Sequence, residues 1–504
     1  MTYSLDKDTL VAVIGAGSMG SGIAQLAAQS GHAVRLFDMQ PGAAARALQR
    51  IGDDLAGAVK KGRIDEAERG AVLGRLQAVE HIEALAGCGL AVEAIVERLD
   101  AKQALFRQLE GLLGAAAVLA TNTSSISITA VAQGLERPQR LVGWHFFNPA
   151  TRMKLVEIIG GVETDRALVD ALHTLSKAWG KTAVDAPNAP GFIVNRVARP
   201  YYAEGLRLLA ERIAAPQAID RLLREAGGFA LGPFELIDLI GADVNLSVTE
   251  SVFAATGYDT RYAPNLIQQE LVRAGRYGRK AGFGFYDYRD GARPQAVDLV
   301  APAAAPPRLE VGLAPGLLGA LVERLKRAGV AAHTDTGLDD DSLGMESVRI
   351  VLTDGRSAAE RHAHDGRPTV LLDLARDFAT TTVVGATGSA AQLALLAALL
   401  APAGIAVIAL ADVAGLVVMR TVACLANEAA DVMTWTGTTA ADIDTAMRLG
   451  TAYPVGPLAW ADAIGVARVA TVLAHLQAHY GDARYRRAPR LAAAQFEGGR
   501  LANG

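Results

Sequence analysis

The sequence predicts a chain of mixed class, with an α/β domain, an all-α domain, a smaller α/β domain and a second all-α domain in that order. Three observations support this prediction. A glycine-rich turn joins a strand to a helix near the N-terminus, apolar strands alternate with helical stretches, and a helical segment recurs later in the chain. At 504 residues the chain exceeds one hydrophobic core, so several domains are expected.

The first elements predict a dinucleotide-binding site. A strand over residues 10–14 leads into a helix through a turn with three glycines, Gly15, Gly17 and Gly20. The first glycine permits the tight turn, the second lets the backbone approach a pyrophosphate, and the third lets the helix pack on the strand. The next apolar run ends at Asp38, whose carboxylate would accept hydrogen bonds from an adenosine ribose and repel a 2′-phosphate. NAD is therefore favoured over NADP.

A histidine and a glutamate are the strongest candidates for acid/base chemistry. His145 ends the apolar run that starts at Leu141, and Glu157 lies in the following run, with a turn near Thr151 between them. If the two runs pair as a hairpin, both residues are equally far from its midpoint and face each other at roughly 5 Å between Cβ atoms. The carboxylate would hold one imidazole nitrogen and leave the other to accept a substrate proton. The alternative is a buried core histidine beside a solvated glutamate.

Composition and charge argue against several classes of function. The formal net charge of −4 is small for this length, so neither nucleic acid nor an anionic membrane is an expected partner. The two cysteines, Cys88 and Cys424, lie far apart in sequence, which argues against a disulfide framework or a cysteine metal site and fits a reducing cytoplasm. The N-terminus has neither the basic start nor the apolar region of a secretory signal. We therefore expect a cytoplasmic protein without a metal site.

One uncharged segment, residues 380–411, passes a crude length test for a membrane-spanning helix. It reads as strand, helix and strand, with a break around Pro402 and Gly404, so a buried βαβ unit explains it better. With the strand-like runs before it, this segment predicts a small Rossmann-like domain. The domain lacks the three-glycine spacing, and its nearest equivalent, Gly385 to Gly388, is interpreted as structural.

A helical segment of the chain is duplicated. Residues 191–241 align without a gap on residues 415–465, with matching glycines, acidic residues and a Gly-Pro pair. The copies differ at Asn195, which aligns with Met419. Because a polar group is present in one copy and lost in the other, we expect that only the first copy works at a site and that the second is structural.

These features set the expected boundaries. The first helical domain follows a break at Ala189-Pro190-Gly191, and proline and alanine dominate the stretch that precedes the small α/β domain. We expect a dinucleotide-binding domain over 1–187, a helical domain over 188–290, a linker over 291–316, a small Rossmann-like domain over 317–412 and a second, degenerate helical domain over 413–504.

Six motifs together resemble those of the 3-hydroxyacyl-CoA dehydrogenase family, in the tandem form found in bacterial phenylacetate breakdown. They are GAGSMG with Asp38, VEAIVERLDAKQALF, NTSSISIT, GWHFFNPATRMKLVE, APGFIVNR and GRKAGFGFYDY. The resemblance covers nearly the whole chain and implies an N-terminal Rossmann domain, the helical C-terminal domain of this family, NAD as cofactor and an acyl-CoA thioester as substrate. It implies catalytic roles for His145, Glu157, Ser124 and Asn195. It also implies NAD contacts from Asp38, Glu97, Lys102, Asn148 and Lys280.

The implied reaction is the NAD-dependent oxidation of an (S)-3-hydroxyacyl-CoA. His145 would be the base, Glu157 would orient it, and Ser124 and Asn195 would hydrogen-bond the reacting oxygen or the thioester carbonyl. Each has a structural alternative: Ser124 and Asn195 as helix caps, Asn148 as a turn residue, Glu97 and Lys102 as a surface ion pair, and Lys280 as a solvated charge. At the level of the whole chain, a sugar-acid dehydrogenase or a non-catalytic NAD-binding protein would share the dinucleotide fingerprint.

These motifs do not indicate which acyl chain the substrate carries. 3-Hydroxyadipyl-CoA, the substrate implied by the phenylacetate form, needs a cation for its far carboxylate, and three arginines are candidates: Arg199, Arg207 and Arg152. 3-Hydroxybutyryl-CoA is the alternative substrate. The resemblance also implies that the helical domain mediates dimers in short family members. The second copy could replace that contact within one chain, or the chain could still form a homodimer.

Overall fold

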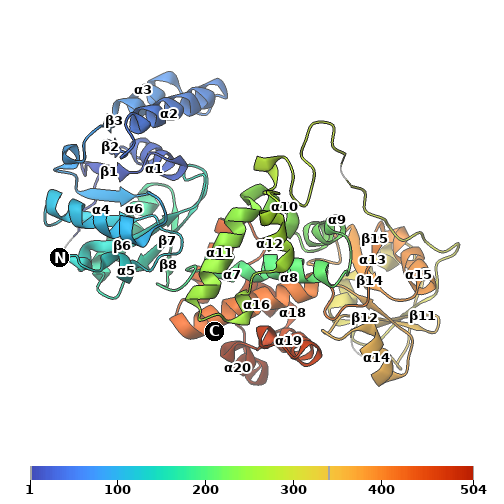
Figure 1. Cartoon of the computed structure of the whole chain (residues 1–504). Coiled ribbons are helices and arrows are strands. Elements are labelled where there is room, and N and C mark those ends of the chain that lie inside the picture. The colour runs from blue at the N-terminus through green and yellow to red at the C-terminus, as the bar shows by residue number, and fades with distance from the viewer. Residues whose placement is uncertain (1–2, 294, 339–340, 503–504) are drawn as a thin grey trace. The chain divides into compact units, whose positions relative to one another are not determined.

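The computed structural model describes residues 3–293, 295–338 and 341–502. Within these ranges the chain forms two compact units (Figure 1). The first unit contains the described residues up to Arg196 together with the short stretch Thr445–Thr451. The second contains Val197–Asp444 and the described residues that follow Thr451.

An eight-stranded sheet forms the centre of the first unit, with the strand order β3-β2-β1-β4-β5-β6-β7-β8. The strands are β1 (Val11–Ile14), β2 (Val34–Phe37), β3 (Leu76–Val79), β4 (Leu90–Glu93), β5 (Val118–Thr121), β6 (Leu141–Phe146), β7 (Leu155–Gly160) and β8 (Thr182–Ala186). All neighbouring strands are parallel except β6 and β7. The apolar strands β1, β4 and β5 are buried along their whole length, as expected in a parallel sheet covered on both faces.

Helices of the first unit connect the parallel strands. They are α1 (Ser18–Gln29), α2 (Ala43–Lys60), α3 (Glu66–Gly74), α4 (Leu99–Leu112), α5 (Ile128–Ala132) and α6 (Arg166–Ala178). In Figure 1, α2 and α3 lie side by side next to β3 at the edge of the sheet. The order β1, α1, β2 confirms the strand, glycine turn, helix and strand predicted from the sequence.

The hairpin predicted around Thr151 is formed by β6 and β7. Its register pairs His145 with Glu157 and Trp144 with Ile158. Because side chains alternate along a strand, Trp144 points to the opposite face from His145, and its indole Nε1 donates a hydrogen bond to Ser176 Oγ of α6 at 3.0 Å. This buried contact fixes the strand that carries the histidine.

Two sets of helices make up most of the second unit. The first set contains α7 (Val194–Val197), which begins in the first unit, α8 (Arg199–Ala210), α9 (Pro216–Arg221), α10 (Pro233–Ile240), α11 (Ala242–Ala255) and α12 (Leu266–Arg273). The second contains α16 (Val418–Thr436), α17 (Ala440–Thr451), α18 (Pro457–Ile464), α19 (Val466–Tyr480) and α20 (Pro489–Glu497). The part of α17 from Thr445 onward belongs to the first unit. The long helices α8 and α16 pack against each other (Figure 1).

Backbone details confirm that the two sets are copies. Gly191 and Gly415 adopt φ values of 76° and 80°, and the residues that follow them also have positive φ. In the first set, Asp220 accepts hydrogen bonds from the amides of Phe234 and Glu235 at the start of α10. The matching carboxylate, Asp444, accepts hydrogen bonds from the two equivalent amides at the start of α18. The same carboxylate therefore caps the same helix in both copies.

A second sheet of seven strands has the order β10-β9-β11-β12-β13-β14-β15. The strands are β9 (Leu309–Val311), β10 (Ala332–Thr334), β11 (Ser342–Met345), β12 (Val348–Leu352), β13 (Thr369–Leu372), β14 (Val383–Thr387) and β15 (Ala406–Ala409), with helices α13 (Gly319–Arg327), α14 (Ala358–Asp365) and α15 (Ala390–Leu400). The prediction of a linker over 291–316 is wrong at its end, because β9 pairs with β10 and β11 and buries Leu309 completely.

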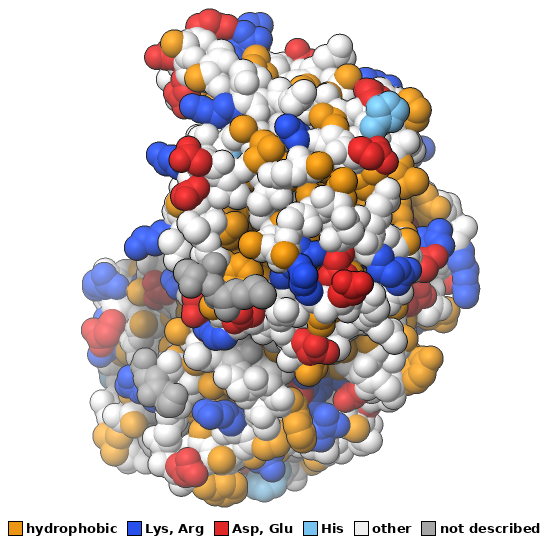
Figure 2. Space-filling model, turned by 90° about the vertical axis from the view of Figure 1, so that its left-hand side faces the viewer, with side chains coloured by type: hydrophobic (Ala, Val, Ile, Leu, Met, Phe, Trp, Pro, Cys, Tyr) orange, Lys and Arg blue, Asp and Glu red, His pale blue; other side chains and the backbone are white. Residues whose placement is uncertain are grey.

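The uncharged segment 380–411 is the βαβ unit β14, α15 and β15, as predicted, with its two strands parallel. Among the described residues no single helix is long and apolar enough to cross a membrane, although the bent pair α18 and α19 passes that test by length and composition. Figure 2 shows acidic and basic side chains interspersed over the face of the molecule that it views, in keeping with the small net charge.

Candidate active site

His145 and Glu157 form a buried pair across β6 and β7. Nδ1 of His145 lies 2.7 Å from Oε2 of Glu157, and the two residues are 6% and 0% exposed. A carboxylate can only accept, so Nδ1 carries the proton, and in the neutral imidazole Nε2 keeps a lone pair. The other carboxylate oxygen, Oε1, accepts hydrogen bonds from the amides of Ile193 and Val194, each at 3.0 Å. The alternative of a solvated glutamate is therefore wrong.

Aromatic rings flank the imidazole. The ring of Phe147 lies 4.5 Å from that of His145, and the ring of Phe192 lies 5.8 Å from it, measured between centroids. The amide of Phe146 donates to Oδ1 of Asn122, which fixes the end of β6. The histidine is thus held by one ionic partner and by apolar packing, which limits its ring to one orientation.

Ser124 lies in a loop that a single carboxylate holds together. Oε1 of Glu97 accepts hydrogen bonds from Thr123 Oγ1 at 2.6 Å, from the Ser124 amide at 2.9 Å, and from the hydroxyls of Ser124 and Ser125 at 3.2 Å each. The amide nitrogen Nδ2 of Asn195 donates to the Ser124 carbonyl at 3.4 Å. The structure therefore brings Ser124 and Asn195 together. The residue that caps α5 is Ser127, not Ser124.

Lys102 supports this loop from beneath. Its side chain is 1% exposed, and its Nζ lies 2.6 Å from Glu93 Oε1 and 3.2 Å from Glu97 Oε2. Burial would raise the pKa of Glu97, but Lys102 and the hydrogen bonds from the Ser124 loop hold the pKa below its usual value. The alternative of a surface pair is wrong for Lys102. In this arrangement Lys102 positions Glu97, and its own contact with a cofactor stays a prediction.

Sequence reasoning missed Glu93, which completes this cluster. The Glu93 side chain is fully buried and also accepts a hydrogen bond from Thr121 Oγ1 at 2.6 Å. A signal was present, because Glu93 is an acid at the end of the apolar run of β4, where a buried carboxylate needs a partner.

The glycine turn has the shape that a pyrophosphate needs. Gly15 adopts a φ of 104°, and a Cβ there would overlap the carbonyl of Ala94. A Cβ on Gly20 would overlap the carbonyl of Gly15, so this glycine allows α1 to pack on the turn. By contrast, a Cβ on Gly17 would meet nothing within 4 Å, which leaves open space at the N-terminus of α1. This cradle fits the phosphates of a dinucleotide.

Asp38 and Asn148 both contact the turn. Oδ2 of Asp38 accepts a hydrogen bond from the Ala16 amide at 2.7 Å, which ties the end of β2 to the glycine loop. Oδ1 of Asn148 accepts a hydrogen bond from Ser18 Oγ at 3.4 Å, so this residue does more than form a turn before Pro149. Met39 follows Asp38 directly and is 85% exposed, an apolar surface that sequence reasoning did not single out.

Lys280 lies in the second unit. Its Nζ pairs with Asp243 at 2.6 Å, and the side chain is about half exposed, at 46%. Its contact with a cofactor stays a prediction.

Among the residues that the structure describes, no group of three His, Cys, Asp or Glu side chains could hold a metal ion.

The second copy keeps the anchor of this site but lacks its chemistry. The strands β7 and β14 occupy equivalent places, because each is followed by a helix, a parallel strand and a set of helices. Glu157 is the third residue of β7, and the third residue of β14 is Gly385, which has no carboxylate. The corresponding carboxylate directly follows the neighbouring strand β13. Asp373 accepts hydrogen bonds from the amides of Val417, Val418 and Met419, and burial raises its pKa to about 6. No histidine takes part in this contact.

Family models match almost the entire chain. The 3-hydroxyacyl-CoA dehydrogenase NAD binding domain matches residues 10–189, and the C-terminal domain of the same family matches residues 191–288 and 415–503. A third model, the 3-hydroxybutyryl-CoA dehydrogenase reduced Rossmann-fold domain, matches residues 350–413.

Individual relatives give the same result. The chain is 42% identical over 479 residues to the 3-hydroxyadipyl-CoA dehydrogenase of Escherichia coli K12, covering 94% of this chain and 95% of that one. It is 39% identical to a probable 3-hydroxybutyryl-CoA dehydrogenase of Bacillus subtilis, which covers 56% of this chain and 97% of the relative.

Among solved structures, the crystal structure titled 3-hydroxybutyryl-CoA dehydrogenase from E. coli K12 superimposes with a TM-score of 0.89 at 40% identity and covers 98% of this chain and 99% of that one. The family models match more than half of the chain, and a full-length relative exceeds 40% identity. The chain belongs to the NAD-dependent 3-hydroxyacyl-CoA dehydrogenase family of oxidoreductases.

Proposed function

We propose that the chain oxidises (S)-3-hydroxyadipyl-CoA to its 3-oxo thioester, with His145 as the general base. The observation that carries this proposal is the pairing of His145 with Glu157, which leaves Nε2 of the imidazole as a proton acceptor. A secondary alcohol must lose its hydroxyl proton as the hydride leaves C3. NAD, when bound, supplies the acceptor of that hydride.

The other residues have supporting roles in the proposal. Glu157 holds the imidazole ring and stabilises the imidazolium that forms when Nε2 takes the proton. Ser124 and Asn195 hydrogen-bond the reacting oxygen or the thioester carbonyl, which fixes C3 for hydride transfer. The hydrogen bond between Asn195 and the Ser124 carbonyl supports a shared role for this pair.

For the cofactor, the proposal assigns the pyrophosphate to the glycines Gly15, Gly17 and Gly20 and the adenosine ribose to Asp38. Glu97 and Asn148 are assigned to cofactor contacts in the same unit, with Lys102 acting through Glu97. The exposed apolar side chain of Met39 is suited to cover an adenine ring next to that ribose. Lys280 is assigned a further cofactor contact.

The adipyl chain is proposed because the relative that matches over nearly its full length is named for it. The alternative is 3-hydroxybutyryl-CoA, since a crystal structure that matches nearly the whole chain and several half-length relatives are named for that substrate. A cytoplasmic location and a homodimer also belong to the proposal. The two cysteines are free and buried, which is compatible with a reducing compartment.

NADH formation at 340 nm tests the proposal. Purified protein is assayed with (S)-3-hydroxyadipyl-CoA and (S)-3-hydroxybutyryl-CoA side by side, with NADP⁺ as the control cofactor. The proposal predicts a higher kcat/KM for the adipyl thioester and a strong preference for NAD⁺. A higher kcat/KM for the butyryl thioester would favour the alternative substrate, and no rate with either thioester would contradict the proposed reaction.

A further inference from the structure

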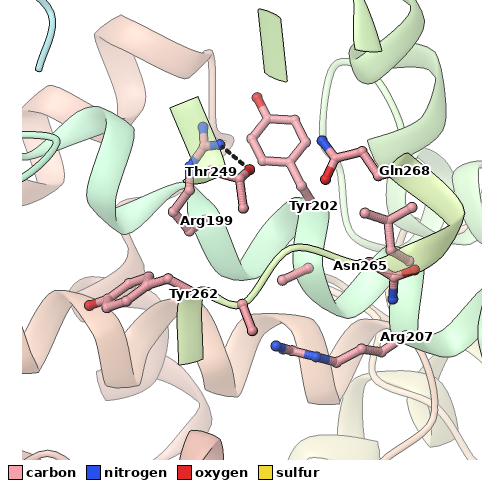
Figure 3. A pocket seen from close by; sticks show the side chains of 10 residues that line it. Arg199, Tyr202, Arg207, Thr249, Tyr262, Asn265 and Gln268 are labelled. Atoms are coloured by element: carbon pink, nitrogen blue, oxygen red, sulfur yellow. Dashed lines mark hydrogen bonds between the residues drawn. The ribbon is translucent and has the colours of Figure 1, made fainter. Parts of the chain in front are cut away.

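The second helical set does not duplicate the local features of the first. In the first set, α8, α11 and α12 enclose a small pocket, which Figure 3 shows from close by. Three of its lining side chains, Arg199, Tyr202 and Arg207, belong to α8. The gapless alignment of the two copies places Ala423, Ala426 and Asp431 at these positions. Any contribution of the second set to function therefore comes from other parts of its helices.

One segment of the second set belongs to the same unit as the candidate active site. The helix α17 begins at Ala440, and its part from Thr445 to Thr451 lies in the first compact unit. All other described residues of this set belong to the second unit. The segment therefore shares a unit with His145 and Glu157, and its contacts there bear on the proposed reaction.

Gly450, near the end of α17, is in close contact with two apolar side chains. A Cβ at this position would lie 2.8 Å from Cδ2 of Leu155 and 3.0 Å from Cγ2 of Val194. Both side chains are buried, and the β-branched valine has little rotamer freedom. The contact therefore leaves no room for a side chain at position 450, and a glycine fits there although glycine is unfavourable inside a helix.

The two residues that Gly450 contacts lie on either side of the Glu157 anchor. Leu155 is the first residue of β7, two positions before Glu157, so the two side chains point to the same face of the sheet. The amide of Val194 is one of the two that donate to Oε1 of Glu157, at 3.0 Å. Gly450 thus packs against the strand that carries the glutamate and against the helix start that binds its carboxylate.

The first helical set makes a matching contact with the small sheet. The residue aligned with Gly450 is Ala226, which ends a π-helical turn, η3 (Leu222–Ala226), that packs on β14. A Cβ on Gly385 of β14 would lie 3.1 Å from Cδ1 of Leu222. In both contacts a glycine allows a helical segment to approach a strand closely. Each helical set therefore places the aligned segment against a strand, which makes the contact of α17 with β7 part of the duplicated architecture.

We infer that Gly450 is a positioning residue for the proposed base. By packing on Leu155 and Val194, the end of α17 keeps the start of α7 against β7, so that Glu157 binds the backbone amides and His145 at the same time. The inference rests on the proposed function and gives the second helical set a part in turnover.

Gly450→Ala tests this role, because the added methyl group must displace Leu155 or Val194. Since a misplacement of about 1 Å can lower turnover about 100-fold, we expect kcat with (S)-3-hydroxyadipyl-CoA to fall about 10–100-fold. Gly57→Ala is the matched control. Gly57 also lies within a helix of the first unit, but a Cβ there would meet nothing within 4 Å, so kcat should stay near the native value.

Three further readouts distinguish positioning from a general loss of structure. The dissociation constant of NADH, followed by its fluorescence, should be unchanged in Gly450→Ala, because the glycine turn at Gly15 belongs to other elements. Hydrogen exchange at the amides of Ile193 and Val194 should become about 10-fold faster. Leu155→Val shortens the side chain nearest to Gly450 by one carbon, so the double variant Gly450→Ala/Leu155→Val should regain most of the lost kcat.

A native kcat in folded Gly450→Ala, or an equal fall in Gly57→Ala, overturns the inference while the reaction stands. A fall that Leu155→Val does not reverse in the double variant overturns it as well. If Gly450→Ala does not fold, the double variant is compared with Leu155→Val alone: a higher kcat in the double variant supports the inference, and an equal or lower kcat overturns it.

A native enzyme that oxidises neither thioester removes the proposed function itself. Hydrogen exchange still tests the contact in that case, because it needs no substrate. Faster exchange at Ile193 and Val194 in Gly450→Ala, with no change in Gly57→Ala, would support the link between α17 and the Glu157 anchor. Unchanged exchange in both variants would overturn it.

Discussion

The carboxylate of Glu157 holds the imidazole of His145 at 2.7 Å with one oxygen and the start of α7 with the other. The glutamate therefore links the proposed base to the backbone just before Asn195. In the second copy, Asp373 accepts hydrogen bonds from the two equivalent backbone amides. No histidine pairs with Asp373 there, so the backbone contact is kept without the acid/base pair.

Substitution of Glu157 by glutamine tests the orienting role. A glutamine can accept from the Ile193 and Val194 amides through its oxygen, but its NH₂ group then faces Nδ1 of His145 and favours the tautomer with the proton on Nε2. Because that tautomer cannot accept the substrate proton, we expect kcat to fall about 10²–10⁴-fold with the fold retained. Stopped-flow NADH formation, with circular dichroism as the control, measures this effect. A kcat within a few-fold of wild type would remove Glu157 from the orienting role.

The burial of Lys102 predicts a large effect on stability. Lys102→Met would leave Glu93 as a fully buried carboxylate without its cation. Removing one partner of such a pair costs about 3–5 kcal/mol of the free energy of unfolding. Urea denaturation of the variant measures this loss. Glu93→Gln with Lys102→Met should recover part of it, whereas an unchanged midpoint for Lys102→Met alone would show that the pair does not form.

The lowered pKa of Glu204 predicts that the stability of the fold decreases at acid pH. Burial would raise its pKa, but Arg207 and Arg420 hold the pKa at about 2, below the ordinary value of 4.5. A lowered pKa means that the folded state binds fewer protons than the unfolded state between these values. The stabilisation of roughly 3 kcal/mol is therefore fully present above pH 4.5 and is lost as the pH falls toward 2.

Urea unfolding of the wild type and of Glu204→Gln, followed from pH 5 to pH 3, checks this dependence. The wild type should lose more stability over this range than the variant does. Parallel curves for the two proteins would mean that Glu204 does not titrate as a buried ion pair.

Much of the architecture could be predicted because it depends on local pattern. The glycine spacing predicted the strand, turn and helix at Gly15, and equal distances from the turn at Thr151 predicted the pairing of His145 with Glu157. The gapless repeat predicted the second helical set, whose positive φ values at Gly415 match those of the first. In each case neighbours in sequence decide the conformation.

The remaining features depend on contacts between distant segments. The sequence places an acid at the end of β4, but it does not indicate that Lys102 is the partner of Glu93, because that cluster forms only where the ends of β4 and β5 meet α4. The strand β9 could not be predicted from its sequence, which lies in a stretch rich in proline and alanine. Its three residues form a strand because they pair with β10 and β11. Tertiary pairing of this kind overrides local composition.

The most direct test of the central claim is the turnover of His145→Ala with the preferred thioester. His173→Ala is the matched control, because His173 forms a similar pair with Asp185 at 2.6 Å in the same unit but has no proposed role in the reaction. With His145 as general base, turnover falls roughly 10²–10⁴-fold in His145→Ala and stays near wild type in His173→Ala. Near-normal turnover in a well-folded His145→Ala would contradict the account.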